Sequence, residues 1–371
     1  MSDGAGTRLT VFRLSVIAAI GGFLFGFDSG VINGTVEGLQ RAFDSNSVGT
    51  GFNVASMLLG CAVGAFVAGQ LADRLGRRNV MSLAAMLFLL SAWGSGASDT
   101  SSEFVFYRII GGLAVGAASI ICPAYISEIA PPQIRGALAT LQQVAIISGL
   151  FASFLSNYVV ADAAGSSLNP WFWGFDAWRW MFWAEIIPAA VFGLLLFTIP
   201  ESPRFLVSSG REASAISVLK QVGEADPERK IADIKASITS QSSPRLSDCF
   251  DATRLLKPIV WIGIGMAILQ QVSGINVVFY YGAVLWQSVG FTESDALLIN
   301  VVSGGISIVA CLIAVAYVDR IGRRPLLVVG SIGMAIALTV VATAFGSGSI
   351  DETGQLVLSP NLGVTALIAA N

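Results

Sequence analysis

The segment LADRLGRR at residues 71–78 returns as VDRIGRRPL at residues 318–326. Each copy places an Asp-Arg pair, a glycine and two further arginines in a short polar stretch between two long apolar runs. The first copy joins the second and third apolar runs, and the second copy joins the eighth and ninth. A pattern that recurs six runs later indicates an internal repeat, and it predicts two six-helix halves and twelve helices in the full architecture.

The apolar runs around these motifs have the length of membrane-spanning helices. About 18 or more mostly apolar residues are needed to cross a hydrocarbon core of about 30 Å. Nine such runs lie near residues 12–35, 52–72, 79–97, 103–124, 138–160, 180–199, 259–287, 294–318 and 325–346. A tenth run begins near Leu362, and we expect it to be cut off at Asn371, after about ten residues, too few to cross a bilayer.

The composition agrees with a membrane protein and excludes other classes. The chain has 371 residues, of which 54% are hydrophobic and 12% charged, whereas soluble domains have about 25% charged residues. An ordinary soluble enzyme is therefore excluded. The net charge of -3 leaves no basic face for nucleic acid. We expect a lipid bilayer as partner and no nucleic acid.

The chain contains no histidine, so it lacks the side chain that most often carries protons and binds metals. Any proton that it moves is expected to be carried by carboxylates. The four cysteines are widely spaced and form no CxxC pair, which predicts neither a disulfide framework nor a metal site. We therefore expect no cofactor.

The basic residues predict the orientation in the membrane, because cytoplasmic loops collect Lys and Arg. A cytoplasmic N-terminus puts eighteen of the 21 Lys and Arg residues on the inner side. Residues 204–257 have a soluble composition and a weak helical pattern, typical of a cytoplasmic linker with short amphipathic helices. The predicted fold is an all-α polytopic membrane protein with an N-terminal six-helix bundle (1–200), a linker (201–258) and a partial C-terminal bundle (259–371).

The predicted helices place two charges inside the membrane, Asp28 in the first helix and Arg108 in the fourth. At 1.5 Å per residue, Asp28 lies about 24 Å above the cytoplasmic start of its helix. Arg108 lies about 8 Å below the outer surface, at nearly the same depth, so the two side chains can pair. One interpretation is a proton switch, in which Asp28 alternates between a paired carboxylate and a released neutral acid. The alternative is a static salt bridge that fixes helix packing.

Three amides and two tyrosines are concentrated in QQVSGINVVFYY at residues 270–281. Amides such as Gln270 donate and accept hydrogen bonds without charge, as a neutral polyhydroxylated solute requires. Gly274 beside them favours local unwinding of the helix at a central site. The alternative interpretation is that these amides hold neighbouring helices together.

These residues together resemble the sugar porter family of the major facilitator superfamily. The resemblance rests on both DR/GRR segments, on residues 270–281 and on GGFLFGFDSGVINGT (21–35), YRIIGG (107–112), SEIAPPQIRGAL (127–138) and PESPRFL (200–206). It implies two six-helix bundles that rock about a central sugar site. Asp28 and Arg108 match the proton-coupling pair of bacterial xylose and glucose symporters in this family, whereas facilitators carry a neutral residue at the first position.

The resemblance also assigns roles to individual side chains. Those that match the sugar site are Phe25, Gln143, Gln270, Gln271 and Asn276. Those that match the outer gate are Tyr280 and Tyr281. Those that match a salt-bridge network closing the cytoplasmic side are Asp73, Arg74, Arg77, Glu128, Arg135, Glu201, Arg204, Asp319, Arg320 and Arg323. The chain departs from the family at Ser307, where many relatives place an asparagine that touches the sugar.

The sequence therefore predicts proton symport of a monosaccharide, a hexose or a pentose, by alternating access. Its partners would be the sugar, protons and the bilayer of the inner membrane, and the protein would be a monomer with a cytoplasmic N-terminus. The alternatives are a facilitative uniporter and a non-transporting sugar receptor on the same scaffold. No nucleophile, base and oxyanion arrangement is present that would predict an enzyme.

Overall fold

The computed structural model describes residues 3–131, 134–240, 249–251, 255–272, 274–288, 290–347, 349–350 and 356–357. Within these ranges the chain is almost entirely helical, and nine helical segments are long and apolar enough to cross a membrane. The nine predicted runs are thus confirmed as helices. The expected tenth helix near Leu362 lies outside the described residues.

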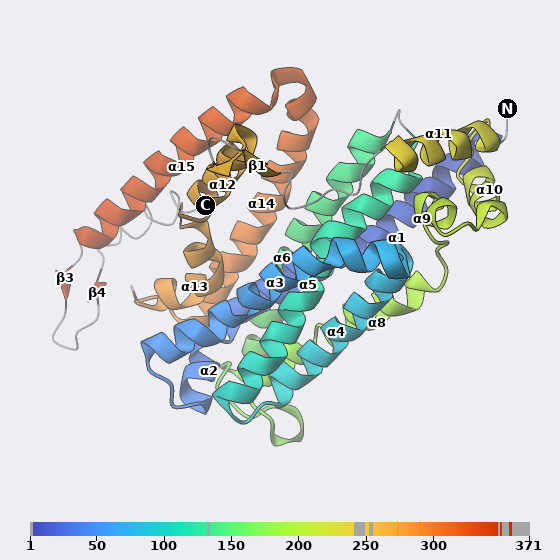
Figure 1. Ribbon diagram of the computed structural model, residues 1–371. Helices are drawn as coiled ribbons and strands as arrows, with labels where there is room; N and C mark the ends of the chain where they lie inside the picture. The colour runs from blue at the N-terminus through green and yellow to red at the C-terminus, as the bar shows by residue number, and fades with distance from the viewer. Residues whose placement is uncertain are drawn as a thin grey trace.

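Six of these membrane-length segments form the N-terminal bundle (Figure 1). Its elements are α1 (Asp3–Val31), η1 (Ile32–Gly34), α2 (Val36–Ala42), α3 (Ser47–Leu75), α4 (Arg77–Ala97), α5 (Ser101–Ile129), α6 (Arg135–Ala164), η2 (Phe172–Gly174), α7 (Ala177–Trp183) and α8 (Ile186–Leu196). Asn46 and Thr100 begin α3 and α5, because their side chains accept hydrogen bonds from Gly49 N and Glu103 N.

The other three membrane-length segments form the C-terminal helices. They are α12 (Pro258–Val272) with α13 (Ile275–Ser288), then α14 (Glu293–Ile321) and α15 (Arg323–Gly346). In the sequence, the segment between the two parts contains α9 (Pro203–Ser208), α10 (Glu212–Gln221) and α11 (Pro227–Ser240), which pack around a small apolar core of their own. Two antiparallel strand pairs complete the described elements, β1 (Phe250–Asp251) with β2 (Leu255–Leu256) and β3 (Ser349–Ile350) with β4 (Leu356–Val357).

The repeated motif has the same backbone geometry in both copies. Gly76 separates α3 from α4 with φ +97° and ψ 157°, and Gly322 separates α14 from α15 with φ +89° and ψ 158°. This region of backbone space is open essentially to glycine alone. The glycine of each motif therefore ends one helix and starts the next, which explains why it recurs at the same place in the repeat.

The N-terminal bundle is tightly packed through small residues. A Cβ added at Gly60 of α3 would lie 2.1 Å from the Ile109 carbonyl oxygen of α5. A Cβ added at Gly26 of α1 would lie 1.8 Å from the Ile146 carbonyl oxygen of α6. Glycines thus let the backbones of these helix pairs approach closely, as is common in membrane helix packing.

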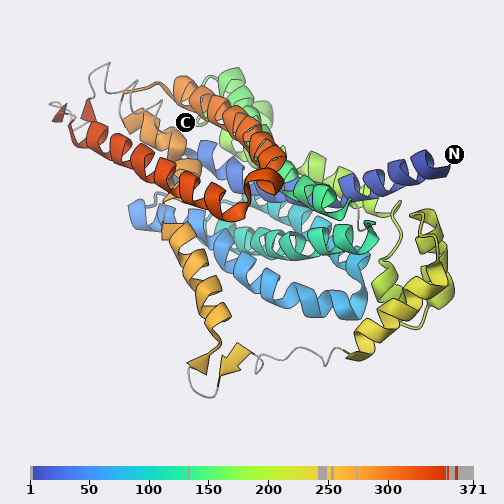
Figure 2. The same cartoon turned by 90° about the horizontal axis from the view of Figure 1, so that it is seen from above.

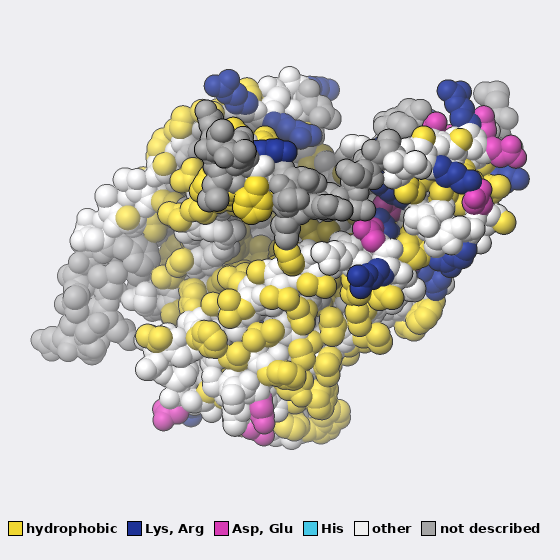
Figure 3. Space-filling view, viewed as in Figure 1, with side chains coloured by type: hydrophobic (Ala, Val, Ile, Leu, Met, Phe, Trp, Pro, Cys, Tyr) yellow, Lys and Arg dark blue, Asp and Glu magenta, His cyan; other side chains and the backbone are white. Residues whose placement is uncertain are grey.

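The C-terminal helices are attached to the bundle through α14, which packs along α6, and through α13, which reaches η1 and α2. Figures 1 and 2 both show α12 and α15 standing away from the N-terminal bundle. Their apolar side chains are exposed, as at Leu269 and Ile332. Figure 3 shows Lys and Arg side chains gathered at one end of the molecule, where its surface is hollowed between the two parts.

Candidate functional site

The expected ion pair between Asp28 and Arg108 is present in the N-terminal bundle. Arg108 Nη1 on α5 binds Asp28 Oδ1 on α1, and both side chains are 1% exposed. The guanidinium also donates from Nη2 to the backbone oxygen of Asp28 at 3.2 Å, and it lies 5.6 Å from the ring centre of Phe182. The depth argument from helix rise thus correctly predicted that the two charges meet, whereas the proposed role in proton transfer stays a prediction.

This ion pair does not satisfy all of its polar atoms. Asp28 Oδ2 and Arg108 Nε have no hydrogen-bond partner among the residues that the structure describes. The backbone of α5 at Gly111 lies close to Asp28, since a Cβ added at Gly111 would lie 3.4 Å from Oδ2. One carboxylate oxygen is therefore buried with unused capacity to bind a proton or a donor.

Glu185 is a third buried ionisable side chain beside the pair, and it was not among the predicted site residues. It lies between the end of α7 at Trp183 and the start of α8 at Ile186, and it is 1% exposed. Its electrostatic partners are Asp28 and Arg108, and its carboxyl group lies within hydrogen-bond reach of the Asp28 carboxyl, a contact that needs one proton shared between the two groups. The signal was available, because Glu185 is a carboxylate inside the predicted 180–199 helix.

The predicted unwinding in the seventh membrane span is also present. The span divides into α12, which ends at Val272, and α13, which begins at Ile275, with Gly274 between them at φ +83°. Asn276 Nδ2 donates to Gln271 Oε1 at 2.5 Å, so the two amides meet across the break. A continuous helix would satisfy its own backbone groups inside the membrane. The break instead leaves polar groups of the span exposed at this point.

The other predicted sugar-site residues lie on three different helices. Gln270 is exposed on α12, Gln143 is exposed on α6, and Phe25 of α1 is half-buried against the core of the N-terminal bundle. The structure adds Gln142, which is buried and has no described partner for either amide atom. The adjacent pair of glutamines in the sequence was the only signal for Gln142, and helix phase decides which of the two turns inward.

Tyr280 and Tyr281 of α13 pack against an apolar cluster shared by both parts of the chain. The N-terminal bundle contributes Phe27 and Val31 to this cluster, and α13 contributes Trp286. Tyr280 also lies within electrostatic range of Asp28 and Arg108. The helix that begins beside the amides at the break therefore also borders the buried ion pair.

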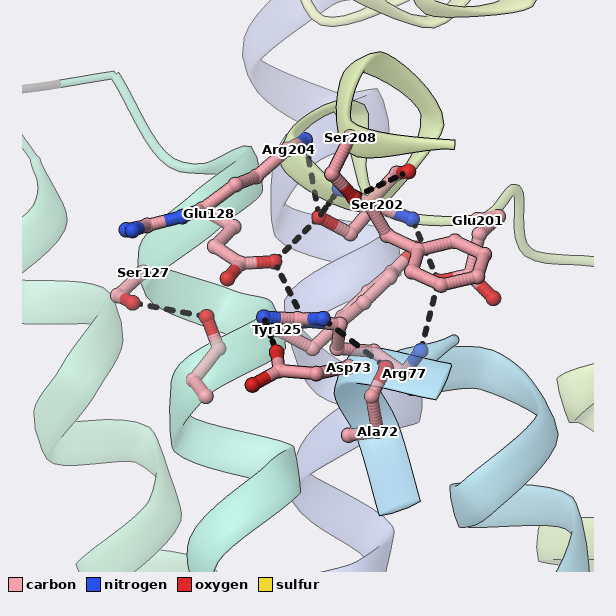
Figure 4. Close-up of polar contacts among 12 residues, drawn as sticks. Ala72, Asp73, Arg77, Tyr125, Ser127, Glu128, Glu201, Ser202, Arg204 and Ser208 are labelled. Atoms are coloured by element: carbon pink, nitrogen blue, oxygen red, sulfur yellow. Dashed lines mark hydrogen bonds and ion pairs between the residues drawn. The ribbon is translucent and has the colours of Figure 1, made fainter. Parts of the chain in front are cut away.

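The DR/GRR segment of the N-terminal bundle takes part in a network of charged and polar side chains (Figure 4). Arg77 pairs with Asp73 at 3.0 Å and with Glu128 at 3.2 Å. Glu128 also accepts a hydrogen bond from the Ser202 hydroxyl, and Glu201 accepts one from the Arg77 backbone N–H at 2.9 Å. Three segments that are far apart in the sequence are thus joined around Arg77.

The remaining predicted members lie around this network or on the C-terminal helices. Arg204 donates its backbone N–H to Ser202, and Arg135 donates to the Ala130 carbonyl oxygen. Arg320 and Arg323 are exposed on the C-terminal helices. Arg74 is exposed as well, and none of these three arginines forms an ion pair with a described side chain. The side chain of Asp319 lies outside what the structure describes. Among the described side chains, no ion pair joins the two copies of the motif.

Comparison with known proteins identifies the family. Residues 14–359 match the family model described as "Sugar (and other) transporter". This chain belongs to the sugar transporter family. The transporter is 51% identical over 362 residues to the glucose transport protein of Synechocystis sp., with 97% of this chain and 77% of that relative covered. It is 37% identical over 367 residues to the D-xylose-proton symporter of Escherichia coli, with 90% and 72% covered.

Solved structures of the xylose transporter XylE from Escherichia coli have the same fold. The transporter matches its partially occluded inward open conformation with a TM-score of 0.81 at 35% identity, covering 97% of this chain and 82% of that one. It matches XylE bound to 6-bromo-6-deoxy-D-glucose with a TM-score of 0.79 at 34% identity, covering 98% and 78%. The all-α major facilitator fold is thus confirmed, and the chain is a multi-pass membrane protein of a family that transports sugars.

Proposed function

We propose that the transporter carries a monosaccharide, a hexose or a pentose, across the inner membrane by proton symport with alternating access. The buried cluster of Asp28, Arg108 and Glu185 carries this proposal. Two carboxylates face one guanidinium, so the fully ionised cluster has one net negative charge. An uncompensated charge at membrane depth costs about 3 kcal/mol, and the binding of one proton removes it.

The position of α13 supports coupling between this cluster and a sugar. Asn276, near its start, takes part in the amide contact at the break, and Tyr280, one helical turn further on, packs against the apolar cluster that contains Phe27, the residue before Asp28. A sugar that engages the amides would therefore shift the helix that borders the proton site. Amide side chains suit a ligand whose hydroxyl groups both donate and accept hydrogen bonds.

A proton is sufficient to drive accumulation. One charge that moves inward through 100 mV supplies about 2.3 kcal/mol. At about 1.36 kcal/mol per tenfold change, this corresponds to roughly fiftyfold accumulation of the sugar. The Lys and Arg side chains gathered at the hollowed end support a cytoplasmic position for that end and for the N-terminus (Figure 3).

Proteoliposome uptake tests the proposal with glucose, xylose and galactose, with and without an imposed inward pH gradient. We expect accumulation only with the gradient, and we expect Asp28→Asn to lose accumulation while it retains downhill sugar exchange. Asp99→Asn is the matched control, because Asp99 is the exposed partner of a surface ion pair with Arg179. Uptake that is unchanged by the gradient and by a protonophore would identify a uniporter. Sugar binding without flux would identify a receptor, and the absence of both binding and flux would refute the sugar assignment.

A further inference from the structure

Two buried asparagines join the N-terminal bundle to the C-terminal helices. Asn33 lies in η1 and Asn300 in α14, and they are 2% and 5% exposed. Asn300 Nδ2 donates to Asn33 Oδ1 at 2.8 Å, and Asn33 Nδ2 donates to the Phe279 carbonyl oxygen of α13 at 2.7 Å. One side chain of the bundle thus uses its donor and its acceptor on two different C-terminal helices.

The packing around this contact requires glycine at one position. A Cβ added at Gly282 of α13 would lie 2.6 Å from Asn300 Oδ1 and 3.1 Å from Asn33 Nδ2. Both distances are too short for a side chain to be accommodated without displacing the amides. Gly282 therefore provides the space in which Asn33 can reach both partners.

The contact lies on the outer side of the buried ion pair and is sealed by apolar residues. Asn33 is five residues beyond Asp28, about 7.5 Å closer to the outer surface at the rise of a helix. The surrounding cluster combines side chains of both parts, namely Ile32, Val36, Ala283, Trp286, Ala296 and Leu297. Water is excluded there, so breaking these hydrogen bonds leaves buried polar groups unpaired unless the two parts separate and water enters.

We propose that Asn33, Asn300 and the Phe279 carbonyl form an interbundle latch that holds the outer side closed and opens once in each transport cycle. This inference rests on the proposed alternating access. An outward-open state requires the two parts to separate on the outer side, and Asn33 lies in one part while both of its partners lie in the other. Separation therefore breaks both hydrogen bonds together, and closure restores them.

A second buried asparagine provides the matched control. Asn157 of α6 donates to the Val31 carbonyl oxygen of α1 at 3.0 Å. Both residues belong to the N-terminal bundle, so this bond keeps its length when the bundle moves as one body. Asn157→Ala removes a buried amide of the same kind whose described hydrogen bond stays within the N-terminal bundle.

Cysteine accessibility tests the latch without sugar or a proton gradient. Val36→Cys serves as the reporter, because Val36 is buried in the sealing cluster, and a membrane-impermeant maleimide is added from outside. Cys61, Cys249 and Cys311 are replaced by serine, and the fully buried Cys122 is kept to report unfolding. We expect about fivefold faster labelling in Asn300→Ala, which loses one bond, and about tenfold or more in Asn33→Ala, which loses two.

Gly282→Ala gives an independent test, since it keeps every polar group and wedges the amides apart. We expect it to speed labelling of the reporter while Cys122 stays unreactive, and we expect Asn157→Ala to label like the parent. Equal reporter labelling in the parent, Asn300→Ala, Asn33→Ala and Gly282→Ala would overturn the latch, as would labelling that rises only together with Cys122. Faster labelling in a protein that moves no sugar would refute the proposed function and leave the latch standing.

Discussion

Arg108 of α5 and Asp28 of α1 form an ion pair that is closed to solvent, yet one oxygen of Asp28 faces the pair's surroundings without a hydrogen bond from a described residue. Glu185 lies beside them in the junction of α7 and α8. A charge pair that served only to fix helix packing would be expected to satisfy its remaining polar atoms. The arrangement instead leaves buried carboxylate oxygens available for a proton.

Loss of Arg108 should destabilise the transporter strongly. Arg108→Ala leaves two buried carboxylates without a cation, and removal of one partner from a buried pair costs about 3–5 kcal/mol. The control is Asp99→Ala, which removes the exposed partner of the Arg179 ion pair and is expected to cost about 1 kcal/mol or less. Thermal unfolding of the purified variants measures the difference. Equal losses in Tm for the two variants would contradict the role of burial.

Glu185→Gln should uncouple the cluster from protons. With Glu185 neutral, the Asp28–Arg108 pair is already balanced, so proton binding no longer removes a net charge. We expect sugar accumulation under a pH gradient to fall at least tenfold, a loss of about 1.4 kcal/mol of coupling, while counterflow of labelled sugar persists. Glu103→Gln, at the exposed start of α5, is the control and should accumulate like the parent.

Replacement of the two motif glycines by alanine should destabilise the protein to different extents. Gly76→Ala and Gly322→Ala both place a side chain at positive φ, which costs about 1–3 kcal/mol. At Gly76 the new Cβ would also lie 2.3 Å from Glu201 Oε2, whereas at Gly322 the nearest atom is Pro325 Cδ at 3.8 Å. We therefore expect the larger fall in Tm for Gly76→Ala. A larger fall for Gly322→Ala would show that the Glu201 contact adds nothing.

Acid outside should favour the closed outer side through Glu37. Burial raises the pKa of Glu37, and the nearby charge of Glu293 adds to this effect, while a hydrogen bond from Gln287 and the charge of Arg41 oppose it. Glu293 in turn accepts hydrogen bonds from Ser166 Oγ at 2.7 Å and Ser167 N at 2.9 Å, across the two parts.

Glu37 is already exposed in this structure, so opening of the outer side removes only its partial desolvation and the nearby charge of Glu293, and its pKa then returns toward the usual value of about 4.3. The closed state therefore binds the proton more tightly. At neutral pH the ionised Glu37 disfavours the closed state, and this penalty disappears as the pH falls through the raised pKa of Glu37. We expect slower external labelling of Val36→Cys at acidic pH, normalised to the exposed position Val48→Cys, and no such pH dependence after Glu37→Gln. An unchanged pH dependence in that variant would exclude Glu37.

The sequence predicted those features of the site that follow from position along a helix. The depth of Asp28 and of Arg108 follows from the rise per residue, so their pairing could be foreseen from two helix starts. The break at Gly274 could be foreseen because glycine stands among amides within one apolar run. Glu185 was not predicted, although the same depth argument applies to it.

Nine membrane-length helices among the described residues, the repeated motif with its helix-ending glycine, and the depth of each polar side chain all follow from the sequence without reference to the fold. These features are local, since they depend on apolar length and on one backbone geometry per motif. The tertiary structure alone decided which side chains meet across helices: Glu185 beside Asp28, Glu128 with Arg77, and Asn33 between Phe279 and Asn300. Depth is one coordinate, whereas such contacts also require the rotation and lateral position of each helix, which only packing fixes.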